Sequence, residues 1–265
     1  MPSNTWIEQL ARFGYAAKGV VYFIIGLLAI PVAFGSGSKT ADTSGALDTI
    51  VAQPFGKFLL ALIAFGLMGY VLWRLTQALF DPEHQGKINA KRIVQRLGYA
   101  LSGLSYAGVS LSAVQTVFGE EGDDSSWRRD WAARLLEQPL GQELFWIVGA
   151  IAIAVGVSFL YEAYTAKFRE HFKLLNMSKA QIQWATWLGR FGISARGAAF
   201  GLIGLLVIQA ALQDDPGEVQ GLGGSLQALA EEALGQWILG AIAFGFIAYS
   251  LYMLIQARYR RIDPP

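Results

Sequence analysis

The 265-residue chain contains no cysteine and only two histidines, His84 and His171. Without cysteine, the protein has no disulfide, no thiolate metal site, no iron–sulfur cluster and no cysteine nucleophile. Both histidines lie in polar, charged segments, so neither is placed to ligate haem or to relay protons inside an apolar region. The sequence therefore predicts neither a cofactor nor a metal ion, and histidine-ligated b-type cytochromes are excluded.

Charge is also scarce. Charged residues form 15% of the chain and hydrophobic residues form 54%, whereas soluble domains usually contain about 25% charged residues. The formal net charge of +1 gives no indication of nucleic acid or of an acidic substrate as a partner. This composition suits a lipid environment better than water.

Six long apolar stretches follow one another along the chain. Each is long enough to form a helix that crosses a bilayer, which needs about 20 residues. The first stretch follows a short polar leader, as in a signal peptide, but its pattern recurs twice downstream, so we expect it to be retained. The predicted spans cover residues 14–34, 55–80, 97–118, 141–164, 187–212 and 235–257.

The basic residues are distributed unevenly about these spans. When residues near helix ends are assigned to the nearer side, the side with both termini holds 16 of the 21 Lys and Arg, with 6 of the 20 Asp and Glu. The opposite side holds the other 5 basic and 14 acidic residues. Because short cytoplasmic loops are rich in Lys and Arg, we predict that the amino and carboxyl termini are both cytoplasmic.

The chain contains three copies of one unit. Each first helix opens with a similar octapeptide: RFGYAAKG at 12–19, RLGYALSG at 96–103 and RFGISARG at 190–197. Each second helix opens with a similar tetrapeptide: QPFG at 53–56, QPLG at 138–141 and EALG at 232–235. The three pairs share one direction, which predicts an all-α membrane protein of three parallel two-helix repeats around a pseudo-threefold axis.

We divide the chain accordingly. The whole of 1–265 forms a single membrane domain, with repeats at 6–80, 92–166 and 186–258 and cytoplasmic linkers at 81–91 and 167–185. Between the paired helices lie short amphipathic segments, which we expect to lie along the outer interface or to cap the bundle. Their apolar residues are Leu47, Ile50 and Val51, then Trp131 and Leu135, then Leu226, Leu229 and Ala233.

The octapeptides, together with the linker sequence DPEHQGK at 81–87, resemble the bacterial membrane family named domain of unknown function 1206. The resemblance covers essentially the whole chain and implies three two-helix units, without an established activity or ligand. It also implies a bacterial plasma membrane, or a thylakoid if the host is a cyanobacterium. The third copy departs from the pattern at Ile193 and at Glu232-Ala233, so chemistry that needs three identical copies is not expected.

Two basic residues within the spans attract attention because intramembrane charge is costly. Lys18 and Arg196 hold equivalent repeat positions, six residues after Arg12 and Arg190. At 1.5 Å of helical rise per residue, each lies roughly 9 Å further into the membrane. Two alternatives are open: the basic group extends back to the lipid headgroups, or it belongs to a specific buried site.

Polar residues of the second helices share this level. Gln77, Glu162 and Gln256 occupy matching positions near the cytoplasmic ends. If Lys18 or Arg196 neutralises Glu162, the group serves to fix helix register. If the group is open to the cytoplasm, its positive charge favours an anion or a phospholipid headgroup. The complete candidate set is Arg12, Lys18, Gln77, Arg96, Glu162, Arg190, Arg196 and Gln256.

Three classes of function compete. We predict no enzyme, because the spans offer no histidine, cysteine or carboxylate pair and no phosphate-binding glycine motif follows a strand. A channel or transporter for a small solute or anion needs polar residues at several depths, whereas these gather at one end. A non-catalytic accessory, assembly or lipid-organising component requires only tight packing and basic loops, and we favour it. The expected partners are the lipid bilayer, its anionic headgroups and another membrane protein, but not nucleic acid.

Overall fold

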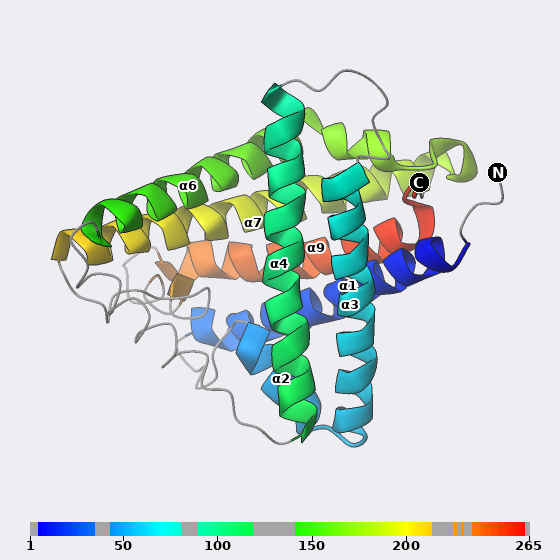
Figure 1. The fold of residues 1–265 in the computed structure, drawn as a ribbon, viewed down its shortest axis with the longest axis horizontal. Coiled ribbons are helices and arrows are strands. Elements are labelled where there is room, and N and C mark those ends of the chain that lie inside the picture. Colours follow the sequence, from blue (N-terminus) through cyan, green and yellow to red (C-terminus); the bar gives the residue numbers. More distant parts are fainter. Residues whose placement is uncertain are drawn as a thin grey trace.

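The computed structural model describes residues 5–34, 43–80, 90–118, 141–213, 225–226, 229 and 235–262. Within these residues, the long helices are α1 (Thr5–Ala33), α3 (Gly56–Phe80), α4 (Ala90–Phe118), α6 (Gly141–Thr165), α7 (Lys179–Gln213) and α9 (Gly235–Tyr259) (Figure 1). A short helix, α2 (Thr43–Val51), precedes α3. Two short 3₁₀ helices, η1 (Lys167–His171) and η2 (Leu174–Asn176), connect α6 to α7.

The long helices confirm the six predicted spans. Each contains a stretch that is long and apolar enough to cross a bilayer. These stretches are Glu8–Ala33, Gly56–Phe80, Gln95–Phe118, Gln142–Thr165, Lys179–Leu212 and Gly235–Tyr259. The protein is therefore an all-helical, multi-pass membrane protein over the residues that are described.

Helix packing follows a cyclic order. The second helix of each repeat packs along the first helix of the next, so that α3 pairs with α4, α6 with α7, and α9 with α1. The last repeat thus pairs with the first, so that each repeat contacts both of the others. Within a repeat, α1 also packs on α3 and α7 packs on α9. This order confirms the predicted pseudo-threefold arrangement of three repeats.

The contacts within the first and third repeats depend on small residues. A Cβ added at Gly66 of α3 would lie 2.7 Å from the Cβ of Ala17 on α1. At the equivalent position of the third repeat, a Cβ added at Gly245 of α9 would clash with the Cβ of Ala195 on α7. Close approach of helix backbones at small residues is the usual mode of packing in membranes, where burial of apolar surface does not drive association.

The second repeat departs from this order. Its helices α4 and α6 do not pack along each other within the described residues, and they are the least buried of the six spans. In Figure 1, α4 runs down the view beside α3, whereas α6 runs across it beside α7. Among the described residues, the ring of helices is therefore open between α4 and α6.

The helices converge toward the end at which α1 begins and α9 ends, and they diverge toward the opposite end (Figure 1). The linker between α6 and α7 lies at the convergent end. There the amide of Lys173 donates to the carbonyl of Tyr259 at 2.8 Å, and the amide of Arg261 donates to that of His171 at 2.7 Å. Both outer helix ends and this linker thus lie on one side, as six spans require. The side of the membrane that they face stays a prediction.

The described residues include part of the amphipathic segments. In α2, Leu47 and Ile50 are buried, and the helix packs against α1, α3 and α4. Leu226, from the equivalent segment of the third repeat, is fully buried as well. The packing of α2 on three helices caps the bundle, which is one of the two predicted placements. The segment containing Trp131 and Leu135, and also Ala233, lies outside the described residues.

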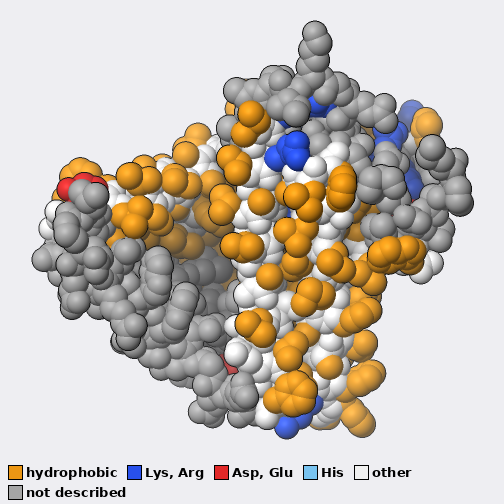
Figure 2. Space-filling view, in the orientation of Figure 1, with side chains coloured by type: hydrophobic (Ala, Val, Ile, Leu, Met, Phe, Trp, Pro, Cys, Tyr) orange, Lys and Arg blue, Asp and Glu red, His pale blue; other side chains and the backbone are white. Residues whose placement is uncertain are grey.

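The surface agrees with a lipid-facing bundle. Hydrophobic side chains cover the visible length of α3 and α4 in Figure 2. Lys and Arg gather mainly in the upper part of this view, close to the convergent end of the helices. An apolar flank with basic residues near one end is the pattern expected of helices that pass through a bilayer into an aqueous compartment.

Candidate functional site

Lys18 lies in the middle of the bundle, surrounded by tyrosines. Its side chain is 2% exposed, and its Nζ donates a hydrogen bond to the hydroxyl of Tyr70 at 3.1 Å. The same Nζ lies 4.4 Å from the ring centroid of Tyr106, 4.6 Å from that of Tyr70, 5.6 Å from that of Tyr249 and 6.0 Å from that of Tyr22. The amine is thus directed into the protein and does not extend to the surface. Cation–π attraction from several rings stabilises a desolvated ammonium.

Arg74 shares the same hydroxyl. Its Nε donates to the Tyr70 oxygen at 2.7 Å, and its guanidinium carbon lies 5.0 Å from the Tyr70 ring and 5.1 Å from the Tyr99 ring. One phenol oxygen therefore accepts hydrogen bonds from two basic side chains, one on α1 and one on α3. The sequence interpretation omitted Arg74, although a charge within an apolar span is a signal that could have revealed it.

Arg196 brings a third basic group to the same centre from α7. Its Nη1 donates to the hydroxyl of Tyr249 at 2.7 Å, and its guanidinium carbon lies 4.6 Å from the ring of Phe159 and 5.6 Å from that of Tyr22. Its Nε is buried and has no hydrogen-bond partner among the described residues. The environment of Arg196 thus repeats that of Lys18, with Tyr249 in the place of Tyr70.

The resemblance between these environments reflects the repeats. Tyr70 and Tyr249 hold the same position in the second helices of repeats one and three, as Gly56 and Gly235 do. On the first helices, one level is formed by Lys18, Ser102 and Arg196, and the next by Tyr22, Tyr106 and Phe200. We call Lys18, Arg74, Arg196, Tyr22, Tyr70, Tyr106 and Tyr249 the central cluster. It lies where all three repeats meet.

The central cluster has a formal excess of positive charge. No described carboxylate lies within 4 Å of Lys18, Arg74 or Arg196, and the ion pairs found among the described residues join Glu8 to Arg12 and to Lys173. Glu162 is half-buried and does not form the ion pair with Lys18 or Arg196 that the sequence suggested. Even with Glu162 counted, three cations and one anion leave two positive charges, 3 − 1 = 2. Buried charge of this kind normally has a counter-charge.

The two glutamines of the candidate set have different surroundings. Gln77 accepts a hydrogen bond from Nη1 of Arg74 at 2.9 Å, which connects it to the central cluster. Gln256 accepts from Arg260 at 3.1 Å and donates to the hydroxyl of Tyr252. Both side chains are buried. Each glutamine thus orients an arginine, but only Gln77 is joined directly to a residue of the central cluster.

The remaining arginines of the candidate set cap helix ends. In each repeat, the arginine that opens the first helix donates to carbonyl groups at the carboxyl end of the preceding second helix, where unpaired carbonyls and the helix dipole favour a cation. The contacts are Arg12 with Ala257 at 2.7 Å and Arg258 at 2.6 Å, Arg96 with Ala78 and Leu79 at 2.6 Å each, and Arg190 with Tyr164 at 3.3 Å. We name these three residues the cap arginines.

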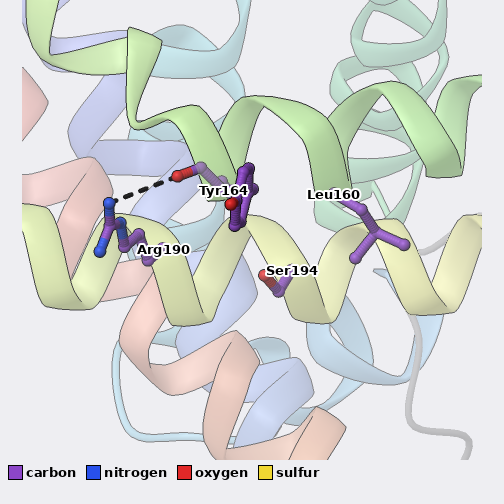
Figure 3. A pocket seen from close by; sticks show the side chains of 5 residues that line it. Leu160, Tyr164, Arg190 and Ser194 are labelled. Atoms are coloured by element: carbon purple, nitrogen blue, oxygen red, sulfur yellow. Dashed lines mark hydrogen bonds between the residues drawn. The ribbon is translucent and has the colours of Figure 1, made fainter.

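An open groove lies between α6 and α7 at one of these caps. It has a volume of about 260 Å³ and is lined by Leu160, Ala163, Tyr164, Arg190 and Ser194. Figure 3 shows Arg190 reaching across to the backbone of Tyr164, with Ser194 and Leu160 further along the two helices. The groove is separate from the contacts that define the central cluster, and its polar residues are the cap pair Arg190 and Tyr164 together with Ser194.

No group of three or more His, Asp or Glu side chains suited to a metal ion occurs among the residues described. The described candidate residues are dominated instead by nitrogen donors and phenol hydroxyls. Such groups recognise anions through charge and hydrogen bonds. The central cluster thus presents groups of the kind that donate hydrogen bonds to an anion.

Comparison with known proteins places the chain in a family. The model of the family described as Domain of Unknown Function (DUF1206) matches three times, at residues 13–81, 97–166 and 191–260. The chain is also similar to the uncharacterized protein YxxB of Bacillus subtilis (strain 168), with 35% identity over 261 residues that cover 98% of this chain and 94% of that protein. No solved structure matches.

Proposed function

The chain belongs to the family of domain of unknown function 1206, and we propose that it is a non-catalytic, lipid-organising component of the bacterial plasma membrane that binds an anionic group. The observation that carries the proposal is the central cluster, in which Lys18, Arg74 and Arg196 have no described carboxylate partner. The phosphate or carboxylate of a ligand supplies the counter-charge.

The energetics favour ligand binding over a purely structural cluster. A buried cation without a counter-charge is destabilising, and its replacement by an apolar residue of similar volume often leaves stability unchanged or improved. Three such cations in one cluster would therefore stabilise the helix packing less well than apolar residues of similar volume. Arg and Lys beside tyrosine hydroxyls instead provide the donors that bind an oxyanion.

Transport of a small anion is a second candidate. Lys18 lies ten residues after Glu8, where the first span begins, so it is about 15 Å along a span of 26 residues. Its amine then extends toward Tyr70, which also lies in the interior of a span. A charge near the middle of a span answers the objection that a channel needs polar residues at several depths, whereas the sequence interpretation placed them only at one end of the spans. Flux of phosphate or chloride into vesicles that contain the protein would favour this candidate over the first.

The proposal is tested with the purified protein in mild detergent. We expect wild type to retain phosphate-bearing lipid, or to be stabilised thermally by inorganic phosphate, and we expect K18Q/R196Q to lose at least about tenfold in affinity. That factor follows because each hydrogen bond to a charged group contributes roughly 1.5–3 kcal/mol. Native mass spectrometry reads lipid retention, and tryptophan fluorescence during heating reads stabilisation by phosphate.

The matched control is K57Q/K179Q, which removes two exposed lysines outside the central cluster and should bind as wild type does. If K18Q/R196Q does not fold, K18M and R196M single variants replace it, since apolar side chains of similar length suit a buried site. Unchanged lipid retention and phosphate stabilisation in a folded cluster variant would disprove the proposal.

A further inference from the structure

The opening between α4 and α6 has a cause in the sequence. In repeats one and three, the helices meet at Ala17 with Gly66 and at Ala195 with Gly245. The equivalent residues of repeat two are Leu101 and Ile151, which are bulky. Branched side chains at both positions keep the backbones from the close approach that small residues permit.

Exposure confirms that this contact is missing. Leu101 is 61% exposed and Ile151 is 53% exposed, although both hold positions that are buried in the other repeats. A Cβ added at Gly98 would have no described atom within 4 Å, whereas one added at the equivalent Gly14 would lie 2.5 Å from the backbone nitrogen of Tyr70. At these positions, the sides of α4 and α6 that would face each other are thus apolar and unpartnered within the described residues.

The central cluster lies directly behind this opening. Lys18 contacts the ring of Tyr106, and Arg74 contacts the ring of Tyr99, both on α4. On the other side, Arg196 contacts the ring of Phe159 on α6. The cations therefore line the interior between the two helices that flank the opening. A path from the lipid to the cluster would pass between apolar side chains and end at positive charge.

We infer that the α4–α6 opening is a lateral binding site for an anionic phospholipid, whose phosphate reaches the central cluster while its acyl chains lie against Leu101 and Ile151. The inference rests on the proposed function and names its ligand. Charge complementarity identifies the head, because Lys18, Arg74 and Arg196 outnumber the single nearby carboxylate of Glu162. The exposed apolar helix sides match the tails.

The direct test uses wild-type protein in phosphatidylcholine vesicles that contain phosphatidylglycerol with a photoreactive diazirine on its acyl chain. After illumination, peptide mapping by mass spectrometry should find labelling of residues 97–111 and 147–158 several-fold above that of the outer sides of α1 and α9. The enrichment should disappear in K18Q/R196Q, and phosphatidylcholine carrying the same diazirine should not show it. Uniform labelling, or enrichment that survives K18Q/R196Q, would overturn the inference.

A second variant closes the opening reversibly. Because the chain has no cysteine, L101C/I151C introduces two thiols alone, and both are small enough for α4 to approach α6. We expect oxidation to lower phosphatidylglycerol retention at least about fivefold and reduction to restore it. In the single variants L101C and I151C, which cannot form this disulfide, retention should not respond to oxidation. Retention that does not depend on a disulfide formed between these residues counts against the inference. If no disulfide forms, the labelling experiment decides.

The two proposals fail in different ways. If inorganic phosphate stabilises wild type but not K18Q/R196Q, while phosphatidylglycerol labels the helices uniformly, the central cluster binds a free anion and only the lipid inference is wrong. If neither phosphate nor lipid distinguishes wild type from K18Q/R196Q, both proposals are wrong. A crosslink between α4 of one molecule and α6 of another would instead identify a second copy of the chain as the occupant of the opening. That result would overturn the lipid inference.

Discussion

At the scale of single residues, the cap arginines connect the repeats. Arg12 donates to the carbonyls of Ala257, Arg258 and Arg260 and also pairs with Glu8. These helix ends lack intrahelical partners, so a guanidinium satisfies carbonyl groups that would otherwise need water. A threefold-repeated arginine thus fastens each repeat to the one before it, which explains why the residue opens every unit.

The number of carbonyl contacts that each cap arginine makes predicts how strongly its replacement by alanine destabilises the protein. R12A removes three carbonyl contacts and an ion pair, R96A removes two carbonyl contacts, and R190A removes one that is long and exposed. We expect R12A and R96A to cost about 1–3 kcal/mol and R190A clearly less. Thermal unfolding in detergent measures the order, with K179A, at an exposed lysine, as the control. Equal effects of all three substitutions would contradict the assigned role.

The sequence predicted the composition of the candidate site in part. Lys18 and Arg196 are in the central cluster, because equivalent repeat positions that face the common axis come together. Arg74 and the hydroxyls of Tyr70 and Tyr249 were missed. Their significance depends on the cyclic pairing of helices, which brings α3 and α9 to the axis and cannot be derived from one chain's spacing. Tyr70 and Tyr249 do share a repeat position, and this is the signal that was available.

At the scale of helices, small residues determine in which repeats the two helices pack closely against each other. Span number, span limits and parallel repeats follow from hydropathy and internal similarity, so the sequence predicted them well. The open second repeat was not predicted, because its cause lies in single positions within otherwise similar units. Leu101 and Ile151 stand where the other repeats have alanine and glycine, and an alignment of the three repeats would have revealed the exchange.

The contrast between the closely packed first repeat and the open second repeat predicts different effects of replacing equivalent glycines. G14A places a methyl group 2.5 Å from the backbone nitrogen of Tyr70, which cannot move aside easily, so we expect a loss of about 1–3 kcal/mol from overpacking. G98A meets no described atom within 4 Å and should be neutral or stabilising by up to about 1 kcal/mol, because alanine favours a helix over glycine.

Thermal unfolding of both variants in detergent compares them directly. G192A serves as the matched control, since a methyl group there would also lie 2.5 Å from a backbone nitrogen, that of Tyr249. It should resemble G14A and not G98A. A loss of stability in G98A equal to that in G14A would mean that α4 and α6 pack together in the membrane, and the opening would then be closed.

At the scale of the whole molecule, asymmetry distinguishes this protein from a symmetric pore. Three repeats arranged around an axis would enclose a channel if all three were closed and identical. Here Lys18 and Arg196 are basic whereas Ser102 at the same level is neutral, and the ring formed by the described helices is open on one side. The axis is filled by tyrosine rings and basic side chains. Such a molecule is better suited to hold one ligand from the side than to conduct many along its axis.

The orientation of the molecule in the membrane gives the last prediction. Basic residues are concentrated at the convergent end, where α1 begins and α9 ends, so we expect this end to be cytoplasmic. Because the chain has no cysteine, single thiols can report it. N176C lies in the exposed linker at the convergent end, and Q53C lies exposed at the opposite end before α3.

A membrane-impermeant maleimide applied to intact bacterial protoplasts should label Q53C and spare N176C, and detergent should expose both. The reason is that the lipid barrier separates the reagent from cytoplasmic thiols alone, while both side chains are accessible in the folded protein. The reversed pattern would place the basic end outside. In that case Lys18 and Arg196 would be reached from the outer leaflet, and the phospholipid bound between α4 and α6 would have to come from that leaflet too.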